Sequence, residues 1–318
     1  LAQYQAAGGI RGGSVNLQLS PLSHAASIFS FVHFLVGGTT ILIDRVDPER
    51  IFGAIAEHRV SFMFTVPTVL YSLIDDPARG RHDLSSLELI QYGAAPITGT
   101  RLREAIEVFG YRLIHSYGMT ESTSHISLLG PDDHRIAEGS VGRPLPGIDL
   151  RIAGADGRQC APGEVGEIRV RGPNVFRGYW NDAEETARTL QGGWLHTGDL
   201  GYLDERGFLY IAGRAREMII SGGTNIHPLE IEEAMMRHDA VAEAAVFGLP
   251  HPRWGEAVAA AVVLKPGRST SAEELHTHLR RWLGGYKVPK VLRILDALPR
   301  NAAGKVLKRE LKAHDAFR

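Results

Sequence analysis

Cysteine is almost absent from the sequence, since Cys160 is the only one in 318 residues. An intrachain disulfide and a CxxC metal motif are therefore excluded, and a reducing, cytoplasmic compartment fits this composition best. The chain also lacks an excess of charge of either sign, because 35 Lys and Arg residues oppose 36 Asp and Glu residues. This balance argues against nucleic acid as a partner. The 14 histidines include no HExxH or similar ligand spacing, so no structural metal is expected.

The sequence contains one long uncharged run, at residues 17–43, and no other candidate for a membrane span. A span needs about 20 mainly apolar residues, whereas a proline, two histidines and a pair of glycines interrupt this run. The pattern instead predicts a loop, a buried helix over residues 25–36 and a buried strand over residues 39–43. The chain begins at Leu1 without a charged n-region or a cleavage site, so no signal peptide is expected.

Helical and extended patterns alternate along the first part of the chain. Residues 47–60, 69–76 and 100–110 have helical spacing, and short apolar runs typical of strands lie between them, at residues 61–67, 87–96 and 112–118. This alternation predicts an α/β fold with a parallel sheet and crossover helices. From about Gly139 to residue 213, glycine and proline become frequent and short runs alternate in polarity, which predicts a small antiparallel β subdomain.

The last third of the sequence predicts a smaller α+β domain. Pro228 begins a helical pattern, and Ser271 with Glu274 forms a capping box before a second one. The apolar stripe of that second helix is expected to contain Leu275, Leu279, Trp282 and Leu283. Strands are expected at residues 242–250, 257–267 and 290–299, and a last helix at residues 305–314. We place the domain boundary between residues 214 and 215.

One cluster of candidate site residues directly follows the predicted strand that ends at Ser116, and it consists of Tyr117, Gly118, Met119, Thr120 and Glu121. In open α/β sheets ligands bind at the carboxyl ends of strands, where a glycine lets a ligand approach the backbone. Tyr117 offers a face for stacking, Thr120 a hydroxyl for a phosphate, and Glu121 a hard oxygen ligand for Mg²⁺. Taken alone, the cluster is equally compatible with a turn that carries a surface glutamate.

Three more clusters occur later in the sequence. Residues 194–199 place Asp199 in a glycine-bounded turn, where a carboxylate can accept hydrogen bonds from both hydroxyls of a ribose. Residues 213–225 contain the segments GRARE and SGGTN, and residues 299–305 place Lys305 in a glycine-containing loop. Each has an ordinary structural interpretation as well: an Asx turn for Asp199 and a solvated surface charge for Lys305.

In this order, the motifs resemble those of the AMP-forming acyl-CoA synthetases, within the adenylate-forming superfamily that also holds peptide-synthetase adenylation domains and luciferases. The resemblance covers essentially the whole chain and rests on PLSH (21–24), GAAP (93–96), YGMTE (117–121), GSVGRPLPG (139–147), GYW (178–180), HTGD (196–199), GRARE (213–217), SGGTNIHPLEIE (221–232) and NAAGK (301–305). It implies two half-reactions, in which a carboxylic acid and ATP give acyl-AMP and CoA then displaces AMP. It also implies that residues 1–214 belong to the large domain and that residues 215–318 form a mobile lid.

The resemblance implies a role for each residue at a matching position. The nucleotide is expected to contact Gly93, Ala94, Ala95, Pro96, Ser116, Tyr117, Gly118, Met119, Thr120, Asp199, Arg214 and Lys305. Within this set, Tyr117 and the residues after the preceding strand would hold the adenine, Asp199 and Arg214 the ribose, and Thr120 the α-phosphate. Glu121 would hold Mg²⁺, and Ser116 stands where the family often has glycine. Lys305 matches the lysine that stabilises charge during adenylation, and loss of one such group typically costs about 10²–10³ in rate.

The remaining expected site residues concern CoA, the hinge and the acyl group. Gly222 and Gly223 match the loop that lines the pantetheine tunnel, and Arg216 stands at the hinge, where the family commonly has Asp or Lys. Trp254 and Tyr286 are weaker candidates for CoA contacts, for which plain packing is an equally good interpretation. The acyl pocket is expected to contain His24, Val66, Gly93, Ala94, Gly118 and His125.

The family's phosphate-binding loop, a Ser/Thr/Gly-rich turn that ends in lysine, has no counterpart in residues 1–20. We therefore expect a fragment of a longer enzyme rather than a truncated gene product. The leading hypothesis is a carboxylate–CoA ligase that uses ATP, Mg²⁺ and CoA, and the small residues Ala94, Ala95 and Gly118 favour a medium, long or aromatic acyl group over acetate. The alternatives are an adenylation domain that loads a carrier protein, a luciferase-like enzyme, and a nucleotide-binding remnant without turnover.

Overall fold

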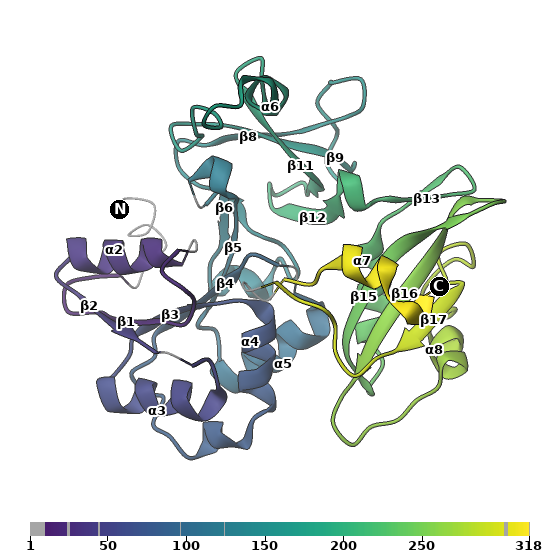
Figure 1. Ribbon diagram of the computed structural model, residues 1–318. Helices are drawn as coiled ribbons and strands as arrows, with labels where there is room; N and C mark the ends of the chain where they lie inside the picture. The colour runs from purple at the N-terminus through teal and green to yellow at the C-terminus, as the bar shows by residue number, and fades with distance from the viewer. Residues whose placement is uncertain are drawn as a thin grey trace. The chain divides into compact units, whose positions relative to one another are not determined.

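The computed structural model describes residues 10–23, 26–43, 45–95, 97–123, 125–301 and 305–317 (Figure 1). The chain divides into two compact units. The first consists of residues 1–197 and 202–211, and the second of residues 198–201 and 212–318.

A seven-stranded sheet runs through the first unit in the order β2-β1-β3-β4-β5-β6-β7. Its strands are β1 (Val15–Gln18), β2 (Thr39–Leu42), β3 (Phe62–Thr65), β4 (Leu89–Gly93), β5 (Leu113–Tyr117), β6 (Ser127–Leu129) and β7 (Arg143–Pro144). Strands β1 to β5 pair in parallel, whereas β6 and β7 pair antiparallel. The helices between the strands are α2 (Ser27–Leu35), α3 (Pro48–His58), α4 (Pro67–Asp75) and α5 (Gly99–Phe109). The predicted parallel sheet with crossover helices is thus confirmed.

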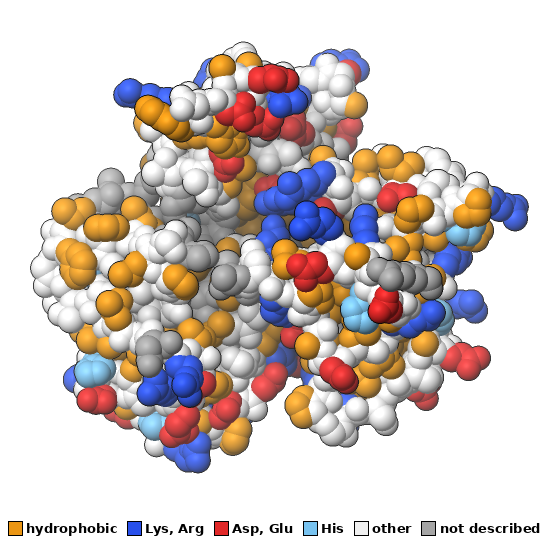
Figure 2. All heavy atoms as spheres, viewed as in Figure 1, with side chains coloured by type: hydrophobic (Ala, Val, Ile, Leu, Met, Phe, Trp, Pro, Cys, Tyr) orange, Lys and Arg blue, Asp and Glu red, His pale blue; other side chains and the backbone are white. Residues whose placement is uncertain are grey.

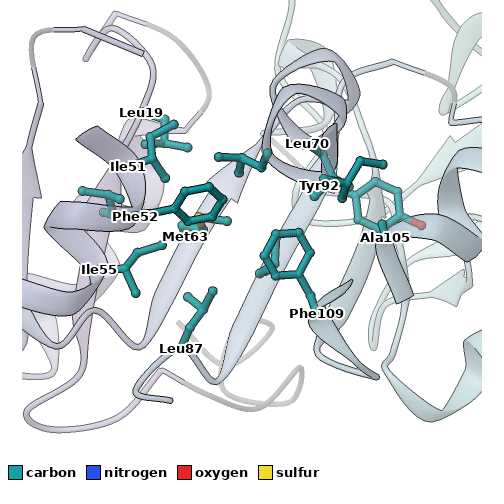
Figure 3. Close-up of a cluster of buried hydrophobic side chains, with 14 of the residues drawn as sticks. Leu19, Ile51, Phe52, Ile55, Met63, Leu70, Leu87, Tyr92, Ala105 and Phe109 are labelled. Atoms are coloured by element: carbon teal, nitrogen blue, oxygen red, sulfur yellow. The ribbon is translucent and has the colours of Figure 1, made fainter. Parts of the chain in front are cut away.

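Apolar side chains from α3, α4 and α5 form the main core against this sheet (Figure 3). Ile51, Phe52 and Ile55 lie on one face of α3 and are fully buried, as are Met63 of β3 and Tyr92 of β4. The sequence predicts this helix from the spacing of Ile51, Ile55 and His58, of which His58 is exposed. This core includes residues of β3, β4 and β5, and the candidate site residues follow the ends of these strands.

The predicted buried helix over residues 25–36 is buried only in part, and the predicted burial of the strand over residues 39–43 is wrong. Strand β2 is the last strand of the sheet, and its Thr39 and Leu42 are exposed. Helix α2 buries only one face, and hydrophobic side chains lie on the surface over it (Figure 2). The exposed apolar residues of this region include Leu22, Phe31, Phe34, Leu35 and Leu42. An apolar run reports the hydrophobicity of a segment, but it cannot report whether a neighbour covers both of its sides.

A second, antiparallel sheet forms the region where the sequence predicts a β subdomain. Its strands are β8 (Asp149–Ala153), β9 (Gly166–Arg171), β10 (Leu190–Gln191), β11 (Trp194–Leu203) and β12 (Leu209–Arg214), and helix α6 (Ala183–Thr189) precedes β10. The strand order is β10-β11-β9-β8, with β12 paired to β11. Buried side chains such as Ile152, Ile168 and Leu195 form its core.

The third sheet lies in the second unit, in the order β14-β13-β16-β15 with β17 paired to β16. Its elements are β13 (Ile219–Ser221), β14 (Thr224–Ile226), α7 (Pro228–Met236), β15 (Val241–His251), β16 (Gly255–Leu264), α8 (Ala272–Leu279), β17 (Val291–Ile294) and α9 (Lys308–Ala313). Apolar faces of α7 and α8 pack together with this sheet. The short 3₁₀ helices of the chain are η1 (Pro77–Gly80), η2 (Thr120–Ser122), η3 (Asp132–Arg135), η4 (Ala215–Glu217) and η5 (Asp315–Phe317).

Helix α8 shows how local sequence decides a helix start. Ser271 Oγ accepts a hydrogen bond from Glu274 N at 3.1 Å, and Glu274 Oε2 accepts one from Ser271 N at 2.9 Å, so the predicted capping box is confirmed. The predicted apolar stripe is wrong at Trp282, which lies beyond the helix end and is 54% exposed, under the guanidinium of Arg237.

These three sheets confirm the predicted fold class: a portion with a largely parallel sheet, a small antiparallel β subdomain and a smaller α+β domain. Among the helices that the structure describes, none is both long and apolar enough to cross a membrane.

Candidate functional site

The carboxyl ends of three neighbouring parallel strands bring several predicted residues to one edge of the first sheet. Thr65 at the end of β3 pairs with Tyr92 of β4, and Gly93 at the end of β4 pairs with Ser116 of β5. Residues that follow these strands therefore lie at the same edge. They are Val66 after β3, Ala94 and Ala95 after β4, and Gly118 and Met119 after β5. Pro96 and His24 lie outside the described residues.

The backbone after β4 is shaped by close packing against β5. A Cβ atom at Gly93 would lie 2.4 Å from Ser116 O and 2.7 Å from Ser116 Oγ, so a side chain has no room there. Ala94 adopts a φ of 67°, in the left-handed region that residues with a side chain rarely occupy. Ser116 is buried, and its hydroxyl donates to Tyr92 O at 3.2 Å. Ser116, at the position where the resembled family often has glycine, thus forms a hydrogen bond with the backbone of β4.

The turn after β5 is closed by its own side chains and presents Thr120 to solvent. Met119 N donates to Ser122 Oγ at 3.1 Å, and Ser122 Oγ donates to Met119 O at 2.9 Å. The 3₁₀ helix η2 that follows contains Thr120 and Glu121. Thr120 is exposed while Ser122 is fully buried, so one side of this turn anchors it and the other side is open.

A distant segment holds Glu121 in place. Tyr179 Oη donates to Glu121 Oε1 at 2.7 Å, and Phe176 N donates to Glu121 O at 2.8 Å. Asn174 Nδ2 donates to two backbone carbonyls of the same turn, those of Ser122 and His125. Partial burial raises the pKa of Tyr179, and its hydrogen bond to Glu121 adds to the effect. The GYW motif contains Tyr179, but no pattern in the sequence indicates its contact with Glu121.

The arrangement around Glu121 fits a magnesium ion that accompanies a nucleotide. No group of three or more His, Cys, Asp or Glu side chains that could hold a metal by itself occurs in the described part of the chain. Mg²⁺, however, is usually bound by one or two carboxylates together with substrate phosphates and waters. A single oriented carboxylate beside an exposed threonine hydroxyl meets that requirement.

His125, an expected acyl-pocket residue, is buried and neutral at physiological pH. Burial lowers its pKa to about 4. Its Nε2 lies 2.7 Å from Gln91 Nε2 of β4, and its ring meets Phe29 of α2 edge to face at 5.8 Å. His125 therefore packs between β4 and α2 and does not carry a charge that an acid could pair with.

In the second unit, Asp199 of β11 and Arg214 at the end of β12 form an ion pair, with Arg214 Nε 3.0 Å from Asp199 Oδ1. The Asp199 side chain is 7% exposed and that of Arg214 is 36% exposed. A buried carboxylate that is held by a half-exposed guanidinium is a preformed acceptor for hydroxyl groups. Both residues were expected at one site only because of the family resemblance.

Lys305 lies in the electrostatic field of the same residues. Desolvation lowers the pKa of its ammonium, and repulsion from Arg214 and Arg216 lowers it further, while Glu217 and Asp199 act in the opposite direction. Its backbone is fixed by hydrogen bonds with Asn301, from Lys305 N to Asn301 Oδ1 at 2.9 Å and from Asn301 N to Lys305 O at 3.0 Å.

Gly222 and Gly223 form the two-residue turn between β13 and β14, where Ser221 pairs with Thr224. Their φ angles are 57° and 79°, as in a type I′ hairpin turn, which by itself favours glycine. Gly222 N donates to Trp254 O at 2.9 Å, and the Trp254 ring stacks on His251 at 4.2 Å. A Cβ at Gly223 would meet no atom within 4 Å, so the surface beside this turn is open. Tyr286 is 54% exposed and lies near Lys287.

Two protein-family models match this chain. Residues 1–180 match the AMP-binding enzyme family, and residues 230–305 match the AMP-binding enzyme C-terminal domain. The chain belongs to the AMP-binding enzyme family. The predicted resemblance is thereby confirmed.

Curated relatives of this AMP-binding family member are CoA ligases of several kinds. It is 39% identical over 307 residues to a medium/long-chain-fatty-acid–CoA ligase of Mycobacterium tuberculosis, a match that covers 93% of this chain and 53% of that protein. It is 40% identical over 300 residues to a feruloyl-CoA synthase of Amycolatopsis sp, covering 93% of this chain and 60% of that protein. The chain therefore spans little more than half the length of these relatives.

Solved structures agree with this family membership. An amide bond synthetase from Marinactinospora thermotolerans superposes with a TM-score of 0.92 at 36% identity, covering 98% of this chain and 65% of that one. An o-succinylbenzoate CoA synthetase from Bacillus subtilis, in complex with its acyl-adenylate intermediate, superposes with a TM-score of 0.85 at 38% identity, covering 98% of this chain and 64% of that one.

Proposed function

We propose that this chain acts in an AMP-forming carboxylate–CoA ligase. In the first half-reaction, a carboxylate oxygen attacks the α-phosphorus of ATP, the bond from that phosphorus to the β-phosphate oxygen breaks, and acyl-AMP and pyrophosphate form. In the second, the CoA thiol gives up its proton, its sulfur attacks the acyl carbon, and the bond from that carbon to the phosphate oxygen breaks. The products are acyl-CoA and AMP.

The observation that carries this proposal is the grouping of Asp199, Arg214 and Lys305 within the second unit. Strand β11 supplies a buried carboxylate for ribose hydroxyls, and the end of the next strand, β12, supplies the guanidinium that orients it. Lys305, much later in the sequence, supplies an ammonium whose pKa is affected by both charges. We assign Lys305 to the stabilisation of negative charge on the attacking carboxylate and the α-phosphate. Such a group accelerates a reaction because it is already oriented toward the charge that develops.

In the first unit, we assign the segment after β4 and the turn after β5 to the rest of the nucleotide. Gly93 to Pro96 and Tyr117 would contact the adenine, supported by the absence of room for a side chain at Gly93. Thr120 would donate its exposed hydroxyl to the α-phosphate. Glu121 would hold Mg²⁺, which when bound supplies positive charge to the phosphates; Tyr179 would keep the carboxylate in one orientation.

We assign the turn of Gly222 and Gly223, together with Trp254, to the CoA pantetheine arm, and Arg216 of η4 to the hinge. The open surface at Gly223 supports the first assignment, since an extended thiol arm needs free backbone beside it. Residues 1–214 and 215–318 are proposed as the large domain and the lid.

The acid is proposed to be a fatty or aromatic carboxylic acid. Among the relatives are ligases named for medium- or long-chain fatty acids, ferulate and 2-succinylbenzoate. Val66, Ala94 and Gly118 are small or medium in size at the shared strand edge, and His125, which packs against Gln91 and Phe29, is neutral, which suits an uncharged acyl body.

The test is an acid-dependent assay of AMP release. This chain, and any longer form of the protein that contains it, would receive ATP, Mg²⁺, CoA and a panel of fatty, hydroxycinnamic and other aromatic acids. A parallel reaction would supply synthetic acyl-AMP and CoA. AMP and acyl-CoA in equal amounts support the proposal; acyl-AMP that forms but transfers only to a carrier protein overturns the assignment of CoA as acceptor.

An amine acceptor is the second candidate, because an amide bond synthetase is among the structures with a TM-score of 0.92. The first half-reaction would be the same, and an amine nitrogen would replace the thiol sulfur in the second. Product mass spectrometry with CoA and simple amines present together distinguishes the two acceptors.

A further inference from the structure

A largely buried lysine in the second unit has no part in the proposed chemistry. Lys308 is the first residue of α9, and its side chain is 22% exposed. Its Nζ lies 2.9 Å from Glu232 Oε1 of α7 and 3.3 Å from Glu217 Oε2 of η4. One ammonium therefore joins α9 to η4 and α7, which both come much earlier in the sequence.

The location of this ammonium is unfavourable without its partners. A positive charge at the first residue of a helix opposes the helix dipole, and burial disfavours the charged form. Although burial acts to lower it, the pKa of Lys308 is raised by the charges of Glu232 and Glu217. Glu232 Oε1 also accepts a hydrogen bond from Val246 N of β15 at 2.8 Å, so the cluster is anchored in the central sheet of the unit.

The cluster lies at the base of the loop that carries Lys305. Leu307 N donates to Pro299 O at 2.8 Å and closes the loop just before Lys308. On the other side of the loop, the Arg300 guanidinium pairs with Glu243 of β15. Ion pairs thus connect one side of the loop to β15 and the other side to α7 and η4.

Glu217 links this base to the surroundings of Lys305. It follows Arg216 directly, and its carboxylate contacts Lys308. Burial would raise the pKa of Glu217, but the positive charges of Lys308, Lys305 and Arg214 lower it. Glu217 therefore stands between the ammonium at the loop base and the ammonium that we assign to adenylation.

We propose that Lys308 is a positioning residue for Lys305: its ion pairs with Glu217 and Glu232 fix the loop base and keep the Glu217 carboxylate from pairing with Lys305. The inference rests on the proposed function, since it concerns the lysine of the first half-reaction. It predicts that Lys308 matters for adenylation and not for the transfer to CoA.

Three variants test this role. Lys308→Met removes the charge and keeps the length of the side chain, Lys308→Arg keeps the charge, and Lys312→Met removes an exposed charge of the same helix as a matched control. We expect Lys308→Met to slow adenylation about 10- to 100-fold, the range that a small misplacement of a reacting group can cost. Acyl-CoA formation from supplied acyl-AMP should change less than twofold. Lys308→Arg should retain most of the adenylation rate.

A second measurement needs no turnover. The rate at which acetic anhydride acetylates Lys305 in the folded chain, followed by mass spectrometry across pH, reports the proton affinity of that amine. In Lys308→Met, Glu217 should turn to Lys305 and stabilise its charged form, so acetylation at pH 8 should slow severalfold. Lys312→Met should leave it unchanged.

The outcomes separate the two proposals. If no form of the protein turns over any acid, the proposed function fails, and the acetylation rate of Lys305 still tests the contact. An equal loss of both half-reactions in Lys308→Met, with a lower melting temperature and unchanged acetylation of Lys305, would show that Lys308 only stabilises the unit. That result overturns the inference.

Discussion

Replacing Tyr179 with phenylalanine tests the account of Glu121. The variant removes one hydroxyl, which donates to Glu121 Oε1 at 2.7 Å, and leaves the ring and its edge-to-face contact with Phe176 in place. A hydrogen bond to a charged group contributes about 1.5–3 kcal/mol to the state that contains it. Because Tyr179 is only partly buried, we take the lower end, about 1.5 kcal/mol, which is about tenfold in an equilibrium constant.

We therefore expect the metal concentration that half-saturates the protein in the presence of ATP to rise about tenfold. Removal of a residue that hydrogen-bonds a metal ligand typically lowers metal affinity by about this factor. The assay is titration with Mn²⁺ as a probe, followed by electron paramagnetic resonance of the free ion, with Mg²⁺-dependent AMP release as a second readout. Tyr111→Phe, a tyrosine of the same unit whose side chain is exposed, is the matched control. An unchanged metal affinity in Tyr179→Phe, with an unchanged melting temperature, would refute the claim that this hydrogen bond orients a metal ligand.

Four further outcomes are expected. Lys305→Ala should lower adenylation about 10²- to 10³-fold and spare thioester formation from acyl-AMP, which separate assays of the two half-reactions can check. The reaction needs the Lys305 cation, and the pKa of Lys305 lies below the ordinary value of 10.5, so adenylation should be intact at neutral pH and decline as pH rises through that lowered pKa. In Lys305→Arg the decline of the adenylation rate at alkaline pH should disappear. If the decline persists there, it belongs to another group. Gly223→Leu should block thioester formation and spare adenylation, whereas Gly223→Asn, which tolerates the positive φ, separates the effect of a side chain from that of the turn. Gly93→Ala should lower the free energy of unfolding of the first unit by about 1–3 kcal/mol, because its Cβ would lie 2.4 Å from Ser116 O. Thermal denaturation checks this, and an unchanged melting temperature would show that β4 and β5 can move apart at that point without loss of stability.

The sequence predicted elements well where a pattern repeats over several turns or is closed locally. The apolar spacing of Ile51 and Ile55 identified a helix, and the pair Ser271 and Glu274 identified a helix start that the structure contains. Prediction from the sequence failed for burial, because burial depends on which other elements pack against a segment. Phe31 and Leu42 are apolar but exposed, because α2 and β2 lie at the end of the sheet.

Some residues of the candidate site were predictable from the sequence, but the contacts between them were not. The alternation of strands and helices predicted the strands that contain Gly93 and Tyr117 and a parallel sheet, and the structure shows that these two strands are neighbours. That Asp199 and Arg214 belong to one site followed from the family resemblance alone, and their ion pair is visible only in the structure. The contact of Tyr179 with Glu121 joins residues 58 positions apart, and only the fold brings them together.

The proposed ligase activity is tested by supplying synthetic acyl-AMP and CoA, and separately ATP, Mg²⁺, CoA and each acid, and by quantifying AMP and acyl-CoA with mass spectrometry. We expect one AMP for each acyl-CoA with at least one fatty or aromatic acid, and loss of the ATP-dependent reaction alone in Lys305→Ala. Failure of this chain and of any longer form of the protein to release AMP, together with no change in melting temperature on addition of AMP or acyl-AMP, would contradict it.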